Sequence, residues 1–444
     1  MASTIIPMSE PDITEKELEA VQEVLRTPTL ALGPRLTRFE HDLATYLGAR
    51  HGVGVSSGTA GLHLCMLAAG VQQDDLVLTT PFSFVASANC ILYVGARPIF
   101  VDVNPLTLTI DPEALDWTVR NVVRSGARAG RRLKAILPVH VFGQPADMDP
   151  ILEIAGARGL AVIEDACEAI GATYRGRPVG TLGDAGVFAF YPNKQMTTGE
   201  GGMIVTGNSA WDALFRSLRN QGRDTFDGWL AHSRLGYNYR LDELSAALGA
   251  AQVARLDEIL AKRARVAAWY RERLERVDGI ELPTAAPWTT RMSWFVYVVR
   301  LAGAARSLAH EAGRGAQDRD DQVRELARLG HERDRVIAEL ERRGIPARPY
   351  FPPIHLQPFY REMFGFAPGA FPITEAAGAT CLALPFFGTM REQQVATVCG
   401  ALEESLRACR SSRSVGGAVT CSNAGVAAGR STPDTGTRAV GASR

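Results

Sequence analysis

The sequence predicts an α/β protein, with a large domain built on a mainly parallel sheet of seven strands and a smaller α+β domain after it. Seven short apolar runs alternate with helix-length segments between residues 51 and 206. Strands buried on both faces read as continuous apolar runs, and helices between them indicate parallel neighbours. A chain of 444 residues is also too long for one ordinary core and suits two packed domains.

An N-terminal helical arm is predicted over residues 1–50. Thr14 and Glu17 have the spacing of a capping box directly before the amphipathic segment LEAVQEVL. A second helix is expected over residues 34–47, because its pattern stops at Gly48.

The large domain is predicted over residues 51–239. Its strands are expected in seven runs, which are, in order, HGVGVSS, LVLTTP, RPIFVDV, KAILPVHV, LAVIEDA, DAGVFAFYP and GGMIVTG. Helix-length stretches lie between several of them, at residues 59–70 and 147–159 for example. These helices are expected to flank the sheet.

The smaller domain is predicted over residues 240–410. It begins with a long helical pattern and continues with a strand-like run at 294–301, another helix, the strand-like run IPARPY and a last helix near 391–408. A charged insertion over residues 302–331 either alters the substrate entrance or forms a surface excursion. The tail, residues 411–444, is rich in Ser, Gly, Ala and Thr without periodicity, so we expect it to be disordered.

The composition argues against several classes of protein. Lys+Arg and Asp+Glu both number 48, whereas proteins that bind nucleic acid or membrane surfaces normally carry a basic face. The chain has no apolar run of the roughly 18 residues that a membrane span requires, and its N-terminus lacks the pattern of a secretory signal. Its seven Cys form no C-x-x-C pair. We therefore expect a cytoplasmic protein without a metal site.

A candidate phosphate site follows the first predicted strand. The strand ends in the small residues Ser56, Ser57, Gly58 and Thr59, where the next helix begins. Free N–H groups at a helix start attract anions, and small residues let the backbone approach them. Alternatively, Ser57 or Thr59 merely caps the helix, which needs no ligand.

Two adjacent acids, Glu164 and Asp165, end a buried strand. Ligands of open α/β sheets sit outside the carboxyl ends of the strands. A carboxylate at such a position suits a metal or a protonated ring nitrogen, and simple helix capping by Asp165 is a further alternative. The eight His form no ligand-spaced pair, which disfavours the metal.

Lys194 follows an apolar, aromatic strand and precedes the segment TTGEGG. An ammonium group is costly in such surroundings, so a nucleophilic amine is expected there, although an ordinary surface role is the alternative. The other three lysines lie in less distinctive surroundings, at Lys16, Lys134 and Lys262.

These features together suit one cofactor, pyridoxal 5'-phosphate (PLP). PLP needs a phosphate cradle, an acid at its pyridine nitrogen, a Schiff-base lysine and a flat group against its ring. Phe84, in TTPFSFVASAN, is the aromatic candidate, and the alternative for it is a plain core position.

The segments that carry these residues resemble the DegT/StrS-type sugar aminotransferases, which have the aspartate aminotransferase fold (PLP fold type I). The resemblance runs from about Ile6 to Ala408 without 302–331. Its motifs are SSGTAGLHL, TTPFSFVASAN, PVHVFGQPADMDPI, VIEDACEAIGA, GVFAFYPNKQMTTGEGGM, RNQG and GYNYRLDELSAALGAAQ. The Lys194 and GYNYR blocks are the most specific of them.

The resemblance implies a role for each matching residue. Lys194 would hold PLP as a Schiff base and move the proton, Asp165 would pair with the ring nitrogen, and Phe84 would stack on the ring. The other implied contacts are the cofactor phosphate for Gly58, Thr59 and Ala60, the partner subunit's cofactor phosphate for Asn238, and the substrate for Tyr350 and His355. The active unit would be a homodimer with a shared site.

Two residues depart from the family's usual pattern. Ala189 stands where members often have a phosphate-binding Ser, five residues before the lysine. Glu168, assigned to the cofactor site, stands where many members have Gln or His, and it resembles the perosamine-synthase-like enzymes, which act on a 4-keto sugar.

The resemblance implies transfer of an amino group from L-glutamate to a nucleotide-linked keto-deoxysugar. Three alternatives stay open: a keto-cyclitol acceptor, a PLP-dependent sugar dehydratase and a regulatory protein that retains the fold. Dehydratase relatives replace the Schiff-base lysine with His, so Lys194 counts against that alternative.

Overall fold

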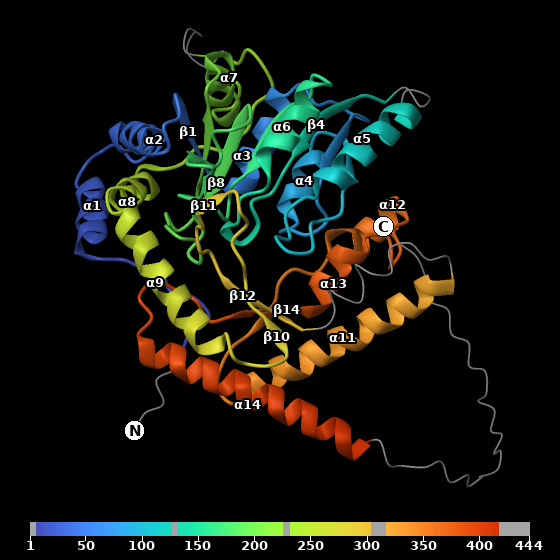
Figure 1. Ribbon diagram of the computed structural model, residues 1–444. Coiled ribbons are helices and arrows are strands. Elements are labelled where there is room, and N and C mark those ends of the chain that lie inside the picture. Colours follow the sequence, from blue (N-terminus) through green and yellow to red (C-terminus); the bar gives the residue numbers. More distant parts are fainter. Residues whose placement is uncertain (1–5, 127–130, 225–230, 303–316, 417–444) are drawn as a thin grey trace, which may run out of the picture.

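The structure, a computed structural model, describes residues 6–126, 131–224, 231–302 and 317–416. Figure 1 shows a large sheet with helices around it and, below it, a smaller domain with two long helices. None of the helices in the described ranges combines the length and apolar character that crossing a bilayer requires.

All seven predicted strands form one sheet in the order β1-β9-β8-β5-β4-β2-β3. Five of them, β2, β3, β4, β5 and β8, pair in parallel, and β9 runs antiparallel to both of its neighbours. The mainly parallel sheet is therefore confirmed. The strands are β1 (His51–Val55), β2 (Leu76–Thr79), β3 (Arg97–Phe100), β4 (Leu133–Leu137), β5 (Ala161–Asp165), β8 (Ala185–Ala189) and β9 (Gly202–Thr206).

Successive strand residues enter two separate hydrophobic cores, one on each face of the sheet. Val187 and Ile204 belong to one core, whereas Phe188 and Val205 belong to the other. This is why the strands read as continuous apolar runs. The helices that cover the two faces include α3 (Gly58–Ala68), α4 (Ala86–Leu92), α5 (Pro112–Gly126), α6 (Met148–Gly156) and α7 (Ser209–Arg219).

The N-terminal arm consists of α1 (Glu15–Leu25) and α2 (Pro34–Leu47), and both pack on α8 (Glu243–Val253). The Thr14 N–H donates to Glu17 Oε2 over 2.7 Å, as the capping-box spacing predicts. The packing of α8 on α2 is close, because a Cβ at Gly249 would lie 2.6 Å from the ring of Phe39.

The long helical pattern after Arg240 forms two helices, α8 and α9 (Leu256–Leu274). Arg255 separates them with a non-helical backbone. Side chains of α8 join the core of the large domain, and α9 leads to the smaller one. The chain therefore passes from one core to the other along α9, whose Leu256 and Leu260 still belong to the core of the large domain.

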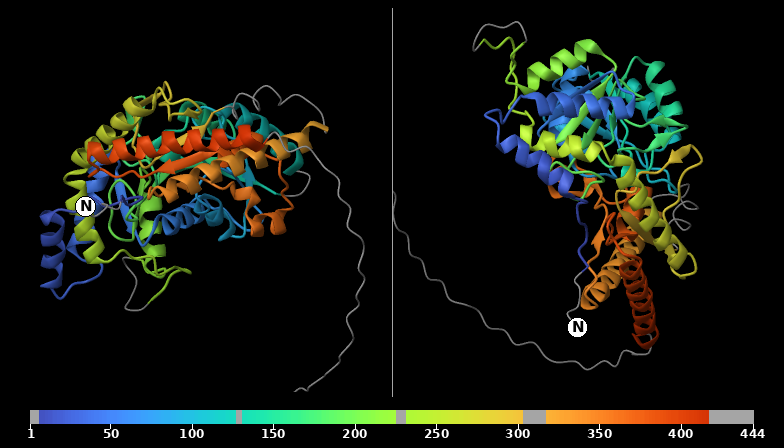
Figure 2. Two further views of the ribbon diagram at one scale, coloured as in Figure 1. Left: turned by 90° about the horizontal axis from the view of Figure 1, so that it is seen from below. Right: turned by 90° about the vertical axis from the view of Figure 1, so that its left-hand side faces the viewer.

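The smaller domain is a four-stranded antiparallel sheet in the order β10-β12-β14-β13, packed against long helices. Figure 2 shows α11 and α14 lying side by side, in agreement with their contacts. The elements are β10 (Ile280–Glu281), β12 (Tyr297–Leu301), α11 (Gln317–Arg342), β13 (Arg348–Pro349), α12 (Pro358–Phe364), α13 (Pro372–Thr380), β14 (Cys381–Leu384) and α14 (Glu392–Gly416). A separate three-stranded sheet joins β6 (Thr173–Tyr174), β7 (Arg177–Pro178) and β11 (Thr289–Arg291).

Two helix boundaries differ from the expectations. The charged insertion 302–331 is helical from Gln317, because α11 begins there, while residues 303–316 lie outside the described residues. Ion pairs between Arg328 and both Glu325 and Glu332 stabilise this helix at spacings of three and four residues. The last helix continues to Gly416, so the first residues of the expected disordered tail are helical, and 417–444 lie outside the description.

Candidate active site

A cavity of about 760 Å³ lies between the carboxyl ends of the parallel strands and the smaller domain. Asp165 ends β5 and Ala189 ends β8, and both line the cavity. The smaller domain contributes the segment from Pro349 to Phe359. The position agrees with the general location of ligands in open α/β sheets.

Seven of the ten predicted site residues line this cavity. They come from five separate stretches of the chain and are Gly58, Thr59, Phe84, Asp165, Glu168, Lys194 and Tyr350. The structure does not bring Ala60, Asn238 or His355 into its lining.

The start of α3 forms one wall of the cavity. Ser57 caps the helix, because its Oγ accepts a hydrogen bond from the Ala60 N–H at 3.1 Å. The Gly58 and Thr59 N–H groups belong to the first helical turn, which finds no partner within its own helix. The Ser57 cap therefore uses a different N–H group of this helix start from those of Gly58 and Thr59.

The Ala60 N–H is not available to a phosphate in this arrangement, because Ser57 occupies it. The Ala60 side chain is also 5% exposed and belongs to the core. Gly58, by contrast, packs at the limit of contact: a Cβ there would lie 2.7 Å from Ala189 Cβ and 2.8 Å from Cys167 Sγ.

The two acids at the end of β5 point to opposite sides, since side chains alternate along a strand. Glu164 is fully buried and accepts from the N–H groups of Gly180, Leu182 and Gly183 over 2.6–2.7 Å, and it lies 2.9 Å from His140 Nε2. Its role is structural.

Asp165 faces the cavity with both carboxylate oxygens held. Its Oδ2 accepts from the Ser87 hydroxyl at 2.6 Å, and its Oδ1 accepts from the Cys167 N–H at 3.2 Å. The residue is 5% exposed. Each oxygen therefore retains capacity to accept a further proton donor from the cavity.

Phe84 is not a core residue. Its side chain is 58% exposed while it lines the cavity, next to the start of α4. A large aromatic ring left exposed at a cavity wall is suited to cover a flat ligand.

Lys194 lies in a turn after β8, where its N–H donates to the Tyr191 carbonyl at 2.9 Å. Its Nζ is 3.5 Å from Glu168 Oε1 and 3.9 Å from the centre of the Phe295 ring. The surroundings are thus less apolar than the sequence predicts, because a carboxylate lies beside the amine.

Glu168 is held between Lys194 and the backbone. Its Oε2 accepts from the Phe142 N–H at 2.9 Å. Burial raises the pKa of Glu168 above its ordinary value, and the charge of Lys194 and the Phe142 N–H oppose that rise without cancelling it. Lys194 and the Phe142 N–H therefore offset only part of the cost of burying the Glu168 carboxylate.

Tyr350 lines the cavity from the smaller domain and stacks on Phe351 at 4.8 Å between ring centres. Burial is the main cause that raises the pKa of its phenol, and the charge of Glu168 adds to it. A neutral phenol at this position can donate a hydrogen bond to a ligand.

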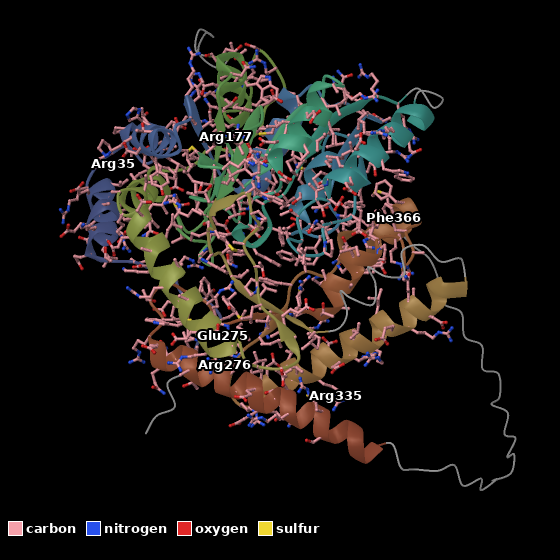
Figure 3. All side chains as sticks on the ribbon, viewed as in Figure 1. Arg35, Arg177, Glu275, Arg276, Arg335 and Phe366 are labelled. Carbon is pink, nitrogen blue, oxygen red and sulfur yellow. The ribbon has the colours of Figure 1, made fainter. Side chains whose placement is uncertain are left out.

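His355 is a correction to the predicted substrate residues. It is fully buried, and its Nε2 lies 3.1 Å from Glu375 Oε1. Its ring packs against Phe371 and against Phe366, which is labelled in Figure 3. The adjacent residue Ile354 reaches the cavity, whereas His355 points into the smaller domain's aromatic cluster.

Asn238 lies outside the cavity of its own chain. It is exposed and pairs with Asn220 through an isolated β-bridge. An exposed position is what the implied contact with a second subunit requires, so this role stays a prediction.

Several lining residues carry polar or aromatic groups that sequence reasoning did not single out. They are Ser83, Ser87, Cys167, Asn193 and Phe295. Asn193 Oδ1 is buried without a hydrogen-bond partner among the described residues. Ser83 and Ser87 are four residues apart on either side of Phe84, which was a usable signal, whereas Phe295 lies far along the chain, just before β12.

These residues fit PLP. An exposed aromatic ring, a buried acid with spare acceptor capacity, a helix start packed too closely for any side chain at residue 58 and a lysine share one cavity. Each is a part that the cofactor needs. No group of three or more potential metal ligands occurs among the described side chains.

Comparison with known proteins identifies relatives along most of the chain. The profile of the DegT/DnrJ/EryC1/StrS aminotransferase family matches residues 11–315 and 322–403. The GDP-perosamine synthase of Caulobacter vibrioides is 37% identical over 402 residues, which are 90% of this chain and 98% of that protein. The GDP-perosamine synthase of Escherichia coli O157:H7 is 31% identical over 400 residues, with coverages of 90% and 98%.

A solved structure agrees with these sequence matches. S. venezuelae DesV, in complex with a ketimine intermediate, superposes with a TM-score of 0.77 at 30% identity and covers 90% of this chain and 98% of that one. The fold is thus that of the PLP fold type I aminotransferases. The chain belongs to the DegT/DnrJ/EryC1/StrS aminotransferase family, and it is an aminotransferase whose cofactor is PLP.

Proposed function

We propose that this aminotransferase moves an amino group from L-glutamate to a nucleotide-linked keto-deoxysugar. The observation that carries the proposal is the meeting of Lys194, Asp165 and Phe84 in one cavity next to the start of α3. Two relatives named GDP-perosamine synthase favour a sugar acceptor joined to GDP.

Different residues would bind different parts of the cofactor. The first-turn N–H groups at Gly58 and Thr59 would hold the cofactor phosphate, since a helix start attracts anions. The Phe84 ring would cover one face of the pyridine, and Asp165 would keep a proton on the ring nitrogen. Glu168 is also assigned to the cofactor site, where its carboxylate would position the Lys194 amine 3.5 Å away.

Lys194 would perform the proton transfer. When bound, PLP supplies an aldehyde that joins an amine and a ring that accepts the electrons of the bond being broken. The Lys194 side chain is 13% exposed, and its amine would take the proton from the donor's Cα and hold it for return. The Phe295 ring, 3.9 Å from Nζ, keeps water from that side of the amine.

We also propose a homodimer with a shared active site, located in the cytoplasm. The exposed position of Asn238 supports a contact between subunits. Tyr350 is proposed to contact the substrate, because it lines the cavity opposite the sheet.

A keto-cyclitol acceptor is the remaining alternative within the same chemistry. Glutamate-dependent amination, measured with a GDP-linked 4-keto-deoxysugar and with a keto-cyclitol in parallel, separates the two. Turnover of the cyclitol alone would replace the proposed acceptor.

The cofactor lysine is tested by substitution. Lys194→Ala should abolish transamination, and Lys16→Ala, on the exposed surface of α1, should leave it unchanged. Wild-type protein with PLP should absorb near roughly 410–430 nm. Borohydride reduction followed by peptide mapping should label residue 194, and a label on another lysine would overturn the assignment.

A further inference from the structure

The acid at residue 165 is held by two serine side chains that form a chain of hydroxyl groups. Ser87 Oγ lies 2.6 Å from Asp165 Oδ2, and Ser83 Oγ lies 2.7 Å from Ser87 Oγ. Ser83 is 5% exposed and Ser87 is 1% exposed. Both serines line the cavity beside Phe84.

The direction of the chain follows from what each group can donate. An ionised carboxylate only accepts, so the single Ser87 hydroxyl proton is used on Asp165. Ser87 Oγ can then only accept from Ser83, whose hydroxyl must donate. The protons therefore point from Ser83 through Ser87 to Asp165.

A competing use of Ser87 is a local bond to its own helix. Its Oγ also lies 3.2 Å from the Phe84 carbonyl, a common contact for serine near a helix start. The bond to Asp165 is shorter by 0.6 Å, as the two distances give, and a charged acceptor strengthens it. The carboxylate is therefore the main partner.

One short segment thus sets two parts of the site. Phe84 lies between the two serines, so the turn that aims its ring also aims the donor to Asp165. The other protein donor to Asp165, the Cys167 N–H, is longer at 3.2 Å. Without Ser87, the buried carboxylate would keep this weaker bond as its one remaining donor among the residues that the structure describes.

We propose that Ser87, supported by Ser83, is a positioning residue that holds the Asp165 carboxylate oriented toward the pyridine nitrogen of the cofactor. This inference rests on the proposed role of Asp165. Ser87 itself does not touch the reacting atoms; it acts through Asp165.

The test compares four variants in the full-length holoenzyme: Ser87→Ala, Ser87→Thr, Ser83→Ala and Ser405→Ala. Ser405 is the matched control, because it is fully buried and bonds to the Ala401 carbonyl in α14, in the smaller domain. PLP affinity is measured by titrating the apoenzyme, the cofactor absorbance is followed against pH, and apoenzyme melting reports the fold.

Ser87→Ala should weaken PLP binding and slow the half-reaction with glutamate, each about tenfold, which is the size expected for one hydrogen bond to a charged group. Its absorbance–pH curve should shift, while apoenzyme melting stays close to wild type. Ser83→Ala should act in the same direction about threefold. Ser87→Thr should restore most of the loss, and Ser405→Ala should change nothing.

Two results would overturn the proposal: Ser87→Ala with wild-type affinity and absorbance–pH curve, or a loss that Ser87→Thr does not restore. If Ser87→Ala fails to fold, a wild-type Ser83→Ala overturns it instead. Asp165→Asn, measured in parallel, distinguishes a failure of the proposed function from a failure of the serine proposal alone. Should Asp165→Asn behave as wild type, the proposed function fails; should it lose activity while Ser87→Ala does not, only the serine chain fails.

Discussion

Buried carboxylates occur in two regions of this protein, and their partners differ. Where the N-terminal arm meets α8 and α9, Arg255 donates to Asp12 at 2.5 Å and to Glu17 at 2.6 Å. Lys262 and Gln252 bind the same two acids at 2.9 and 2.8 Å. In the cavity, Asp165 has two protein donors and faces open volume.

The difference distinguishes acids that stabilise the fold from acids that are available to bind a ligand. Charged groups removed from water need partners, so a saturated acid is a structural element. An acid with spare acceptor capacity beside a cavity is costly for folding and useful for binding. Four measurements test this distinction.

The largest expected effect is on activity, from Asp165→Asn. The amide cannot pair as a charge with a protonated ring nitrogen, so the single-turnover rate with glutamate should fall about 10³-fold. The free energy of unfolding of the apoenzyme should change by less than about 1 kcal/mol. Stopped-flow absorbance and urea unfolding measure both, and a rate within tenfold of wild type would contradict the assignment.

Arg255→Met should have the opposite profile. It leaves Asp12 and Glu17 buried without their shared cation, which should lower the free energy of unfolding by about 3–5 kcal/mol. Urea denaturation measures the loss. Arg265→Met, at an exposed position of α9, is the control and should cost less than about 0.5 kcal/mol. Equal stability of the two variants would remove the structural role of the cluster.

Glu164→Gln should cost about 2–3 kcal/mol of unfolding free energy, because its new NH₂ group would meet backbone N–H donors instead of accepting from them. Turnover per folded molecule should stay within about fivefold of wild type. A loss of turnover without a loss of stability would place Glu164 with the cavity acids.

The pH dependence of stability should give the smallest effect. Burial raises the pKa of Asp12 and of Glu17, but hydrogen bonds, chiefly from Arg255 and Lys262 to Asp12 and from Thr14 and Arg255 to Glu17, outweigh it and leave both pKa values below the ordinary 3.8 and 4.5. The folded protein therefore binds fewer protons than the unfolded chain as pH falls through this range.

The stabilisation from this cluster is thus complete above about pH 4.5 and is lost at more acid pH. Between pH 5 and 3, wild type should lose about 1–2 kcal/mol more than Arg255→Met. Urea midpoints at each pH measure the difference. Parallel curves for the two proteins would show that the cluster does not carry the acid sensitivity.

The sequence predicted the seven strands because apolar runs buried on both faces leave a local signal. It also predicted most of the cavity, since Gly58, Phe84, Asp165 and Lys194 lie in local motifs at strand ends. The residue pattern alone did not show which of two adjacent acids faces the ligand, because that depends on strand phase; the family resemblance indicated Asp165. The burial of His355 was equally hidden, as its partner Glu375 lies 20 residues away.

The predicted start of the helix that became α11 was also wrong. Residues 317–322, which begin α11, are all polar or charged, so the apolar pattern of this helix starts only at Val323. Phe295 was missed because only the tertiary fold brings its ring to Lys194.

The tight packing of Gly58 against Ala189 and Cys167 has a consequence for redesign. Any side chain at 58 would displace the first turn of α3 from the end of β8, so that wall of the cavity tolerates no variation. Gln357 and the 41%-exposed Phe359 lie on the opposite wall. Libraries aimed at new acceptors should therefore randomise positions 357 and 359 and keep glycine at residue 58.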